Sequence, residues 1–340
     1  MTNAVNIAQS GSNNVTFRNR IINGAMMIDQ RNAGASVTLG SGTVYTLDRF
    51  AVQSGSGSKL SAQQNAGSVT PPAGFRNYLG LTSLSAYSVP AGEIFALRQY
   101  IEGFNVADLG WGTAGAQTVT LSFWVRSSLT GTFGGSVNNN SNRSYPFTYT
   151  INAANTWEYE TITIPGDTSG TWATGNTTGL LLELGLGVGS TFSGTAGAWA
   201  GSYFSSATGA TSVVGTNGAT FYATGAQLER GSAASPFEQR LYGTELALGQ
   251  RYYYGSPVNA MYAVGYAPVN GASTWIGLDF PVEMRATPTI TSPSWSLTSA
   301  NTPALQYNTT RGVRYFVSGN SAGGTFVVLG TTALQASSEL

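Results

Sequence analysis

The sequence predicts an all-β protein, in which a jelly-roll or β-sandwich domain is followed by a short connecting helix and a smaller C-terminal β-sandwich domain. Three observations lead to this fold class. Charged residues make up only 9% of the 340 residues, aromatic residues make up 11%, and glycine is abundant. Segments with alternating apolar and polar side chains recur along the chain. Turn sequences such as "PGDTSG" and "SVNNNSN" separate them, as in antiparallel sandwiches.

The strands of the first domain are recognised by their alternation. The first organised block, "FRNRIINGAMMIDQRN", precedes the clearest strand, which covers residues 118–126 ("TVTLSFWVR"). A second strand, residues 159–165 ("YETITIP"), ends at a proline. A third, residues 180–188 ("LLLELGLGV"), carries leucines on one face and Glu183 on the other. On residues 118–126 the expected core face comprises Val119, Leu121, Phe123 and Val125.

Helical signal is concentrated in residues 244–254 ("TELALGQRYYY"). Thr244 is suited to the N-cap and Arg251 to the last turn. Strands resume afterwards, for example at residues 273–280 ("STWIGLDF"), where Ile276, Leu278 and Phe280 share one face.

The predicted organisation has four parts. An N-terminal arm covers residues 1–20 and the jelly-roll domain residues 21–240. A connector helix covers residues 241–255, and the C-terminal β-sandwich covers residues 256–340.

Composition excludes several functions. The net charge is zero and Lys59 is the only lysine, so we expect no nucleic-acid binding. The chain has no cysteine and no histidine, which excludes disulfides, Ser-His and Cys-His nucleophilic sites and Cys/His metal sites. No stretch has the length of a transmembrane helix, and the N-terminus lacks the pattern of a secretory signal, so we expect no membrane insertion.

Three segments together resemble phage and prophage tail-fibre or minor virion structural proteins. They are "NRIINGAMMIDQRNAGASVT" with "YTLDRF", then "GAQLERGSAASPFEQRLYGTELALGQRYYY", and finally "FPVEMRATPTIT" with the terminal "ASSEL". The resemblance implies a virion protein of the tail, synthesised in the host cytoplasm and assembled as a homotrimer. We further expect the N-terminal arm to dock onto a tail or baseplate protein, with a frayed tail as the alternative. The C-terminal domain is at the other end of the chain from this arm and is therefore expected to be the receptor-binding domain.

Within the first domain, "TVTLSFWVRSSLTGTF" and "TWEYETITIPGDTSGTW" resemble jelly-roll carbohydrate-binding modules, with "ATFYATGAQLERG" as their closing strand. Such modules often carry an acidic residue near that strand, which helps to hold a structural calcium ion. Here the corresponding residues are Thr224, Gly225 and Ala226. The resemblance therefore implies binding of host surface polysaccharide, while a calcium site is not supported and no cofactor is expected.

These features leave three functional hypotheses open. A tail fibre that attaches the virion to its host needs no catalytic residue, and a non-fibre baseplate or decoration component is the alternative structural role. A glycan depolymerase would need two carboxylates, for which Glu158 and Glu160 share one strand face, but the sequence favours their interpretation as ordinary strand-surface acids. A glycan-binding surface would use exposed aromatic rings, and core or subunit-interface packing is the alternative for each ring. The glycan-binding candidates are Trp111, Trp124, Trp157, Tyr262, Trp275 and Trp295.

The Arg/Glu-rich stretch between the two domains is interpreted as structural. Glu229, Arg230, Glu238, Gln239 and Arg240 can pair locally or across subunits. Exposed pairs of this kind contribute only about 0–1 kcal/mol each, so their expected role is to set register and orientation.

Overall fold

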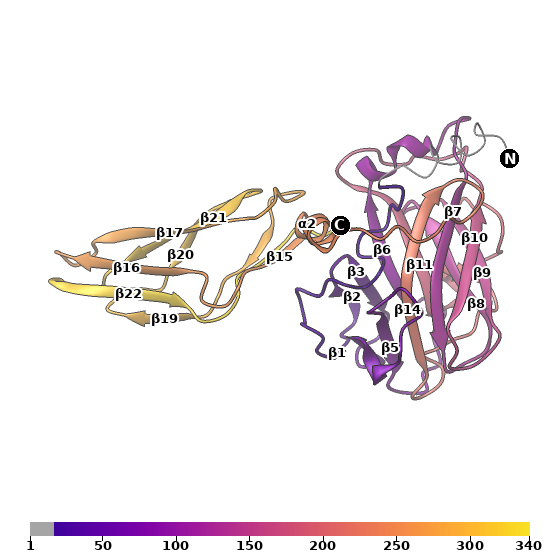
Figure 1. Cartoon of the computed structure of the whole chain (residues 1–340), viewed down its shortest axis with the longest axis horizontal. Coiled ribbons are helices and arrows are strands. Elements are labelled where there is room, and N and C mark those ends of the chain that lie inside the picture. The colour runs from indigo at the N-terminus through magenta and orange to yellow at the C-terminus, as the bar shows by residue number, and fades with distance from the viewer. Residues whose placement is uncertain (1–16) are drawn as a thin grey trace. The chain divides into compact units, whose positions relative to one another are not determined.

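The computed structural model describes residues 17–340, which form two compact units. The first unit comprises residues 17–240, and the second extends from Leu241 to Glu339. Both consist of β-strands, and the single α-helix among the described residues is α2 (Tyr242–Gln250) (Figure 1). The prediction of an all-β fold is therefore confirmed.

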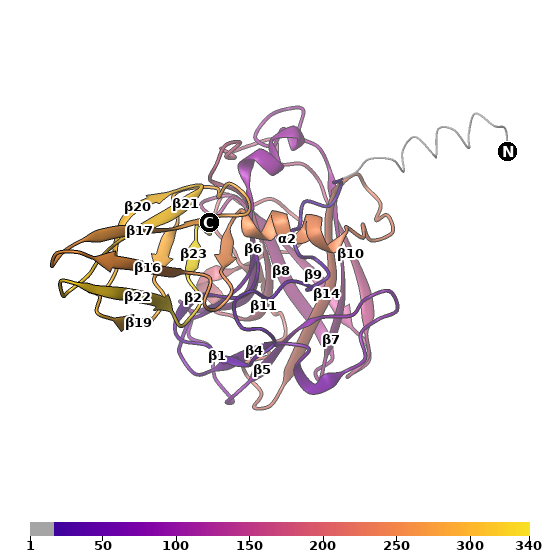
Figure 2. The ribbon, with the colours of Figure 1, turned by 60° about the vertical axis from the view of Figure 1, so that its left-hand side comes forward.

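The first unit is a sandwich of two six-stranded antiparallel sheets (Figures 1 and 2). Strands that follow one another in the sequence repeatedly change sheet, which is the connectivity of a jelly roll. The first sheet has the order β1 (Val37–Thr38), β4 (Leu60–Gln64), β5 (Leu79–Ser83), β14 (Thr220–Arg230), β7 (Val119–Ser127) and β10 (Glu158–Ile164). The second has the order β2 (Gly42–Leu47), β3 (Phe50–Ser54), β6 (Ile94–Glu102), β11 (Thr178–Val188), β8 (Gly131–Asn138) and β9 (Ser144–Ile151).

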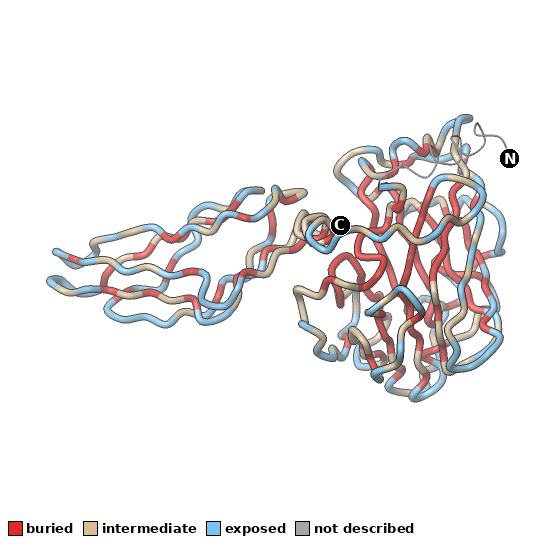
Figure 3. The backbone as a smooth tube through the Cα atoms, in the orientation of Figure 1, coloured by how far each residue is buried: buried red, intermediate tan, exposed pale blue. Residues whose placement is uncertain are grey.

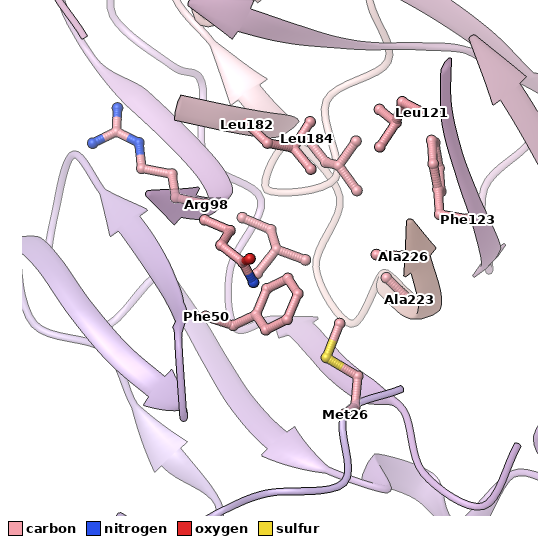
Figure 4. A pocket seen from close by; sticks show the side chains of 11 residues that line it. Met26, Phe50, Arg98, Leu121, Phe123, Leu182, Leu184, Ala223 and Ala226 are labelled. Atoms are coloured by element: carbon pink, nitrogen blue, oxygen red, sulfur yellow. The ribbon is translucent and has the colours of Figure 1, made fainter. Parts of the chain in front are cut away.

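The core of the first unit lies between these two sheets, and buried residues run along the strands in Figure 3. The predicted core face of β7 is confirmed, because Val119, Leu121, Phe123 and Val125 are all buried. Figure 4 shows side chains from both sheets, together with Met26, around a cavity of about 10 Å³ inside this core. A cavity of that size holds one water molecule at most, so it is a packing void and not a ligand site.

A buried ion pair lies on the opposite face of the second sheet. Glu183 of β11 is 0% exposed, and its Oε1 accepts a hydrogen bond of 2.6 Å from Nε of Arg98 on β6. The same carboxylate accepts hydrogen bonds from the Ser205 hydroxyl (2.9 Å) and from the Asn138 amide (2.8 Å). Tyr203 Oη lies 3.0 Å from Glu183 Oε2 and accepts a hydrogen bond from Arg98. The sequence placed Glu183 opposite the leucines of its strand, and the structure encloses it among partners.

The charge states of this cluster follow from its surroundings. Burial raises the pKa of the Tyr203 hydroxyl, and the negative charge of Glu183 raises it further, so Tyr203 stays protonated as a donor. For Arg98, burial acts to lower the pKa, but the neighbouring Glu183 carboxylate outweighs it and the pKa is raised. Tyr203 and Ser205 belong to the segment that carries the short parallel strands β12 (Ser193–Gly194) and β13 (Ser206–Ala207). The ion pair therefore fastens this segment to the second sheet.

The second unit is built from three three-stranded sheets around its own core. Ile276 and Phe280 are buried and Leu278 packs against them, so the predicted inward face of residues 273–280 is confirmed. The sheets have the orders β15 (Tyr253–Gly255), β23 (Gln335–Ser337), β18 (Thr289–Thr291); β16 (Tyr262–Ala267), β22 (Gly324–Gly330), β19 (Trp295–Thr298); and β17 (Ser273–Asp279), β21 (Gly312–Ser318), β20 (Ala304–Thr309).

The helix differs from its predicted bounds. It begins at Tyr242 with Leu241 as N-cap residue, so Thr244 lies inside the first turn and is not the cap. It ends at Gln250, and Tyr253–Gly255 pairs with β23 as strand β15 instead of continuing the helix. Strand pairing and the burial of Tyr252 and Tyr253 outweigh the weak helix propensity of this tyrosine run.

The predicted N-terminal arm, residues 1–20, lies largely outside the described residues. Its last four residues are described, and they belong to the first unit, where Asn19 is buried. Within residues 17–340, no helix has the length and apolar character needed to cross a membrane.

Candidate functional site

An aromatic pair on the outer face of the first sheet forms one side of the candidate site. Alternation on β7 turns Trp124 away from the core face of Phe123 and Val125. Tyr159 of β10 is directly opposite Trp124 in the strand register, and it also faces outward. The two ring centroids lie 5.3 Å apart with the planes tilted by 47°.

A β-bulge at Gly225 shapes the floor of the site. The pairing of β14 with β7 passes from Thr224 opposite Trp124 to Gln227 opposite Ser122, so two residues of β14 face one residue of β7. Gly225 has a φ of 62° in this bulge. A Cβ atom at this position would lie 2.6 Å from Cζ of Phe75 and 3.1 Å from Cδ1 of Trp124. The rings of Phe75 and Trp124 therefore both reach the Gly225 backbone, and only glycine leaves room for them.

We expect the Gly225→Ala variant to lose both stability and the geometry of the site. A left-handed residue with a side chain costs about 1–3 kcal/mol, and the added methyl group would also displace Phe75. Urea unfolding measures the first effect and near-ultraviolet circular dichroism the second. Gly218→Ala is the matched control, because Gly218 also has a positive φ (74°) but nothing within 4 Å of the added carbon. Equal losses of unfolding free energy in Gly225→Ala and Gly218→Ala would show that the close approach of the Phe75 and Trp124 rings to Gly225 does not contribute to stability.

Phe237 completes the site from the segment of residues 231–240. Its ring meets Phe75 edge to face, with the centroids 5.0 Å apart. Ser235 in the same segment is held by Glu229, whose Oε1 accepts from the Ser235 amide (2.8 Å) and whose Oε2 accepts from its hydroxyl (2.6 Å). The Glu229 carboxylate is buried at the end of β14, so it ties this wall of the site to the sheet.

The resulting hollow, here called the aromatic groove, has a volume of about 470 Å³. Its lining contains no charged side chain, and its polar side chains are Ser235, Gln239 and the Tyr159 hydroxyl. Aromatic rings with a few neutral hydrogen-bonding groups are typical of sites for uncharged organic ligands. The lining residues are Ala73, Gly74, Phe75, Trp124, Tyr159, Gly225, Ala234, Ser235, Pro236, Phe237 and Gln239.

Of the aromatic residues predicted from the sequence, the groove includes Trp124 alone. Trp111 is 7% exposed and packs edge to face on Trp172 and Trp199, with centroids 4.7 and 5.3 Å away. Its indole Nε1 donates to the Gln117 carbonyl. Trp157 is partly buried against Tyr78 and donates to the Thr70 carbonyl.

The predicted residues of the second unit lie on two of its sheets, Tyr262 and Trp295 on one and Trp275 on another. Tyr262 on β16 is 58% exposed and Trp275 on β17 is 50% exposed. Trp275 contacts Tyr307 and Phe316, with centroids 5.7 and 5.4 Å away. Trp295 packs on Tyr315 at the edge of the core. Trp275 belongs to a different sheet from Tyr262 and Trp295, and within residues 17–340 none of these three rings contacts another.

Sequence reasoning missed Tyr159, Phe75 and Phe237. Tyr159 could have been found, because it alternates with Glu158 and Glu160 in the same way that Trp124 alternates with Phe123 and Val125. Phe75 and Phe237 lie in irregular segments far apart in the sequence, and only the folded chain brings their rings together.

The two predicted carboxylates, Glu158 and Glu160, lie on β10 facing away from Tyr159. Burial acts to raise the pKa of Glu158, but hydrogen bonds from the Ala153 amide and from Asn152 outweigh it, so the pKa is lowered. Burial, together with the charge of Glu158, raises the pKa of Glu160. Both oxygens of Glu158 are occupied by the turn, with Oε1 2.7 Å from the Ala153 amide and Oε2 2.8 Å from the Asn152 side chain. Glu158 therefore closes the turn between β9 and β10.

The stretch Thr224–Ala226, which corresponds to the position of the calcium-binding acid in carbohydrate-binding modules, contains the bulge at Gly225 beside Phe75 and Trp124. Residues 17–340 contain no group of three or more acidic side chains placed to hold a metal ion.

No protein-family model matches the sequence, and no curated protein matches it. Among solved structures, the carbohydrate-binding module CBM4 is 14% identical, over 62% of this chain and 98% of its own, with a TM-score of 0.30. The family 11 carbohydrate-binding module of Clostridium thermocellum is 9% identical, over 59% of this chain and 100% of its own, with a TM-score of 0.29.

A further similar structure is the enzymatically active domain of tailspike protein 4 from bacteriophage CBA120. It is 12% identical over 64% of this chain and 22% of its own, with a TM-score of 0.30. Likenesses at this level of identity and TM-score say nothing of a ligand, an activity or a partner for this chain.

Proposed function

We propose that this protein is a virion structural protein, a phage tail fibre, that attaches the particle to its host by binding an uncharged cell-surface glycan. The observation that carries the binding function is the aromatic groove of the first unit, with about 470 Å³ of space and no charged side chain in its lining. The virion role rests on the sequence resemblance to tail-fibre proteins. A fibre of this kind resides in the tail of the virion and is made in the host cytoplasm.

The chemistry of the groove favours a sugar. Pyranose rings present C–H faces that pack on aromatic rings, and hydroxyl groups that exchange hydrogen bonds with neutral side chains. The run of rings from Phe237 and Phe75 to Trp124 and Tyr159 supplies the first kind of contact. Ser235, Gln239 and the Tyr159 hydroxyl supply the second.

The absence of charge in the lining selects among sugars. A carboxylated or sulfated ligand would lose hydration in the groove without meeting a cation, which is unfavourable. We therefore infer that neutral glycans bind and that acidic ones bind more weakly.

This function is tested with the purified full-length protein on an array of matched neutral and carboxylated oligosaccharides. The expected result is binding to neutral glycans and competition by the protein with phage for host cells. Absence of binding to every glycan, or binding to acidic glycans alone, would contradict the proposal.

Assembly and attachment form the second part of the proposal. The chain forms a homotrimer, which increases the avidity of weak single sites, and the N-terminal arm, residues 1–20, docks it to a tail or baseplate protein. Light scattering at micromolar concentration is expected to give three times 35.4 kDa. Electron microscopy of labelled particles separates a fibre from a baseplate or decoration component by its position on the virion.

A depolymerase activity is the alternative function. It is suggested by the pKa values of Glu158 and Glu160, which are shifted in opposite directions, as they are in the acid–base pairs of glycosidases. We favour binding without catalysis, since Glu158 is engaged by the turn that it closes. Release of reducing sugars from host polysaccharide, lost in Glu160→Gln, would establish the alternative.

A further inference from the structure

The segment of residues 231–240 has two sides with different partners. One side lines the aromatic groove with Ser235, Phe237 and Gln239. The other side holds the first described residues of the chain, Phe17–Arg20. The same short segment therefore contacts both the groove and the N-terminal residues.

Glu238 makes the central contact with the N-terminal residues. Its Oε1 accepts hydrogen bonds from the backbone amides of Phe17 (2.6 Å) and Arg18 (3.3 Å), and its Oε2 accepts one from the amide of Asn19 (2.9 Å). Three consecutive amides thus converge on one carboxylate. Arg240 adds to this arrangement by donating to the Asn19 carbonyl and by pairing with Glu238 at 3.3 Å.

Further contacts connect Phe17–Arg20 to the wall and floor of the groove. The Arg18 guanidinium donates to the Pro236 carbonyl and lies 3.7 Å from the carboxylate of Glu229, which itself holds Ser235. Asn19 donates to the carbonyl of Ala226 in the bulge and accepts from the Leu228 amide (3.1 Å). The amide of Glu238 donates to Gln227 on β14 (2.8 Å). Removing Phe17–Arg20 would therefore remove contacts both to the segment that carries Phe237 and to β14, the strand that carries Gly225.

We propose that Phe17–Arg20 is a positioning element of the aromatic groove, and that groove occupancy and the attachment of this element stabilise each other. The ligand part of this inference rests on the proposed glycan binding. A ligand that contacts Phe237 and Ser235 favours the conformation in which Glu238 and Glu229 bind Phe17–Arg20. Because the coupling free energy is reciprocal, the attachment of Phe17–Arg20 must increase the affinity for the ligand by the same factor. Residues 1–16 directly precede this element in the sequence, so a ligand in the groove would stabilise the described end of the arm that we propose to dock on the virion.

The test compares the full-length protein with truncations that begin at residue 17 and at residue 21, and with Glu238→Gln. Glu238→Gln keeps the size of the side chain but removes its charge and one acceptor oxygen. Asp108→Ala is the matched control, because it breaks the ion pair of Arg20 (2.7 Å) without touching residues 231–240. Thermal unfolding is recorded for each protein to identify a variant that does not fold. If the truncation that begins at residue 21 does not fold, Glu238→Gln takes its place in the comparison.

The first readout, amide hydrogen exchange of residues 231–240, needs no ligand. Exchange is expected to be at least about tenfold faster in the residue-21 truncation and in Glu238→Gln, because hydrogen bonds to a charged acceptor are lost. The residue-17 truncation and Asp108→Ala are expected to match the full-length protein. Unchanged exchange in both altered forms would overturn the proposal whether or not the protein binds a glycan.

The second readout is affinity for the neutral oligosaccharide that gives the strongest array signal. The residue-21 truncation and Glu238→Gln are expected to bind it about tenfold more weakly, in line with the exchange effect. This oligosaccharide is expected to slow hydrogen exchange of the Arg18 and Asn19 amides in the full-length protein. It is expected to leave their exchange unchanged in the Trp124→Ala variant. Equal affinity of all variants would overturn the coupling while leaving glycan binding intact, and no binding by the full-length protein would refute the proposed function alone.

Discussion

Replacement of Trp124 by alanine is expected to weaken binding of neutral glycans by about thirtyfold or more, because a central aromatic contact in such a site typically contributes 2 kcal/mol or more. Trp124 contacts Tyr159, and its ring, like that of Phe75, lies beside Gly225, so its removal takes away a large part of the aromatic lining. Isothermal titration with the full-length protein measures the effect. Tyr159→Phe, which keeps the ring, is expected to retain most of the affinity that Tyr159→Ala loses.

Trp275→Ala is the matched control for Trp124→Ala. Both residues are outward-facing tryptophans on strands, but Trp275 belongs to the second unit and lies beside Tyr307. The sequence predicts residues 256–340, which include most of the second unit, as the receptor-binding domain, and this variant tests that prediction. Loss of host adsorption in Trp275→Ala, with normal adsorption of Trp124→Ala, would move the receptor site from the groove to the second unit.

Replacement of Glu183 by alanine is expected to have the largest effect on stability. Removing one partner of a buried ion pair leaves the other charge unpaired, so we expect a loss of about 3–5 kcal/mol and a fall in Tm of roughly 6–20 °C. The unpaired charge would be Arg98, and the Ser205 and Asn138 contacts would be lost with it. Scanning calorimetry and urea unfolding measure these changes.

The control for Glu183→Ala is Asp108→Ala in the same unit. Asp108 pairs with Arg20 at 2.7 Å, but its side chain is 47% exposed. An exposed pair of this kind contributes about 0–1 kcal/mol, so this variant is expected to unfold almost as the parent does. Similar losses of unfolding free energy in the two variants would show that burial does not increase the contribution of the Glu183 ion pair to stability.

The strands, and the faces that they bury, could be read from the sequence. Alternation alone placed Val119, Leu121, Phe123 and Val125 in the core and turned Trp124 outward, because successive side chains of a strand point to opposite faces. The same argument placed Ile276 and Phe280 in the second core. The end of α2 was not predicted correctly, since pairing of Tyr253 with Ser337 on β23 depends on a segment far along the chain.

Alternation assigns a side chain to a face but does not say what covers that face. Glu183 was correctly placed opposite the leucines of its strand, yet its burial depends on Arg98, Tyr203 and Ser205, which come from other parts of the chain. Trp111 and Trp124 look equally suited to ligand binding in the sequence. Trp111 is enclosed by Trp172 and Trp199, whereas Trp124 lines the groove.

An all-β chain without histidine or cysteine chemistry could be predicted from the sequence, because composition and the two-residue period of a strand are local properties. The aromatic groove was decided only by the tertiary structure. It requires a bulge at Gly225 on β14, Trp124 and Tyr159 on adjacent strands, and Phe75 and Phe237 from separate irregular segments. Contacts between residues so distant in the chain leave no periodic signal, since the backbone between them sets no fixed spacing.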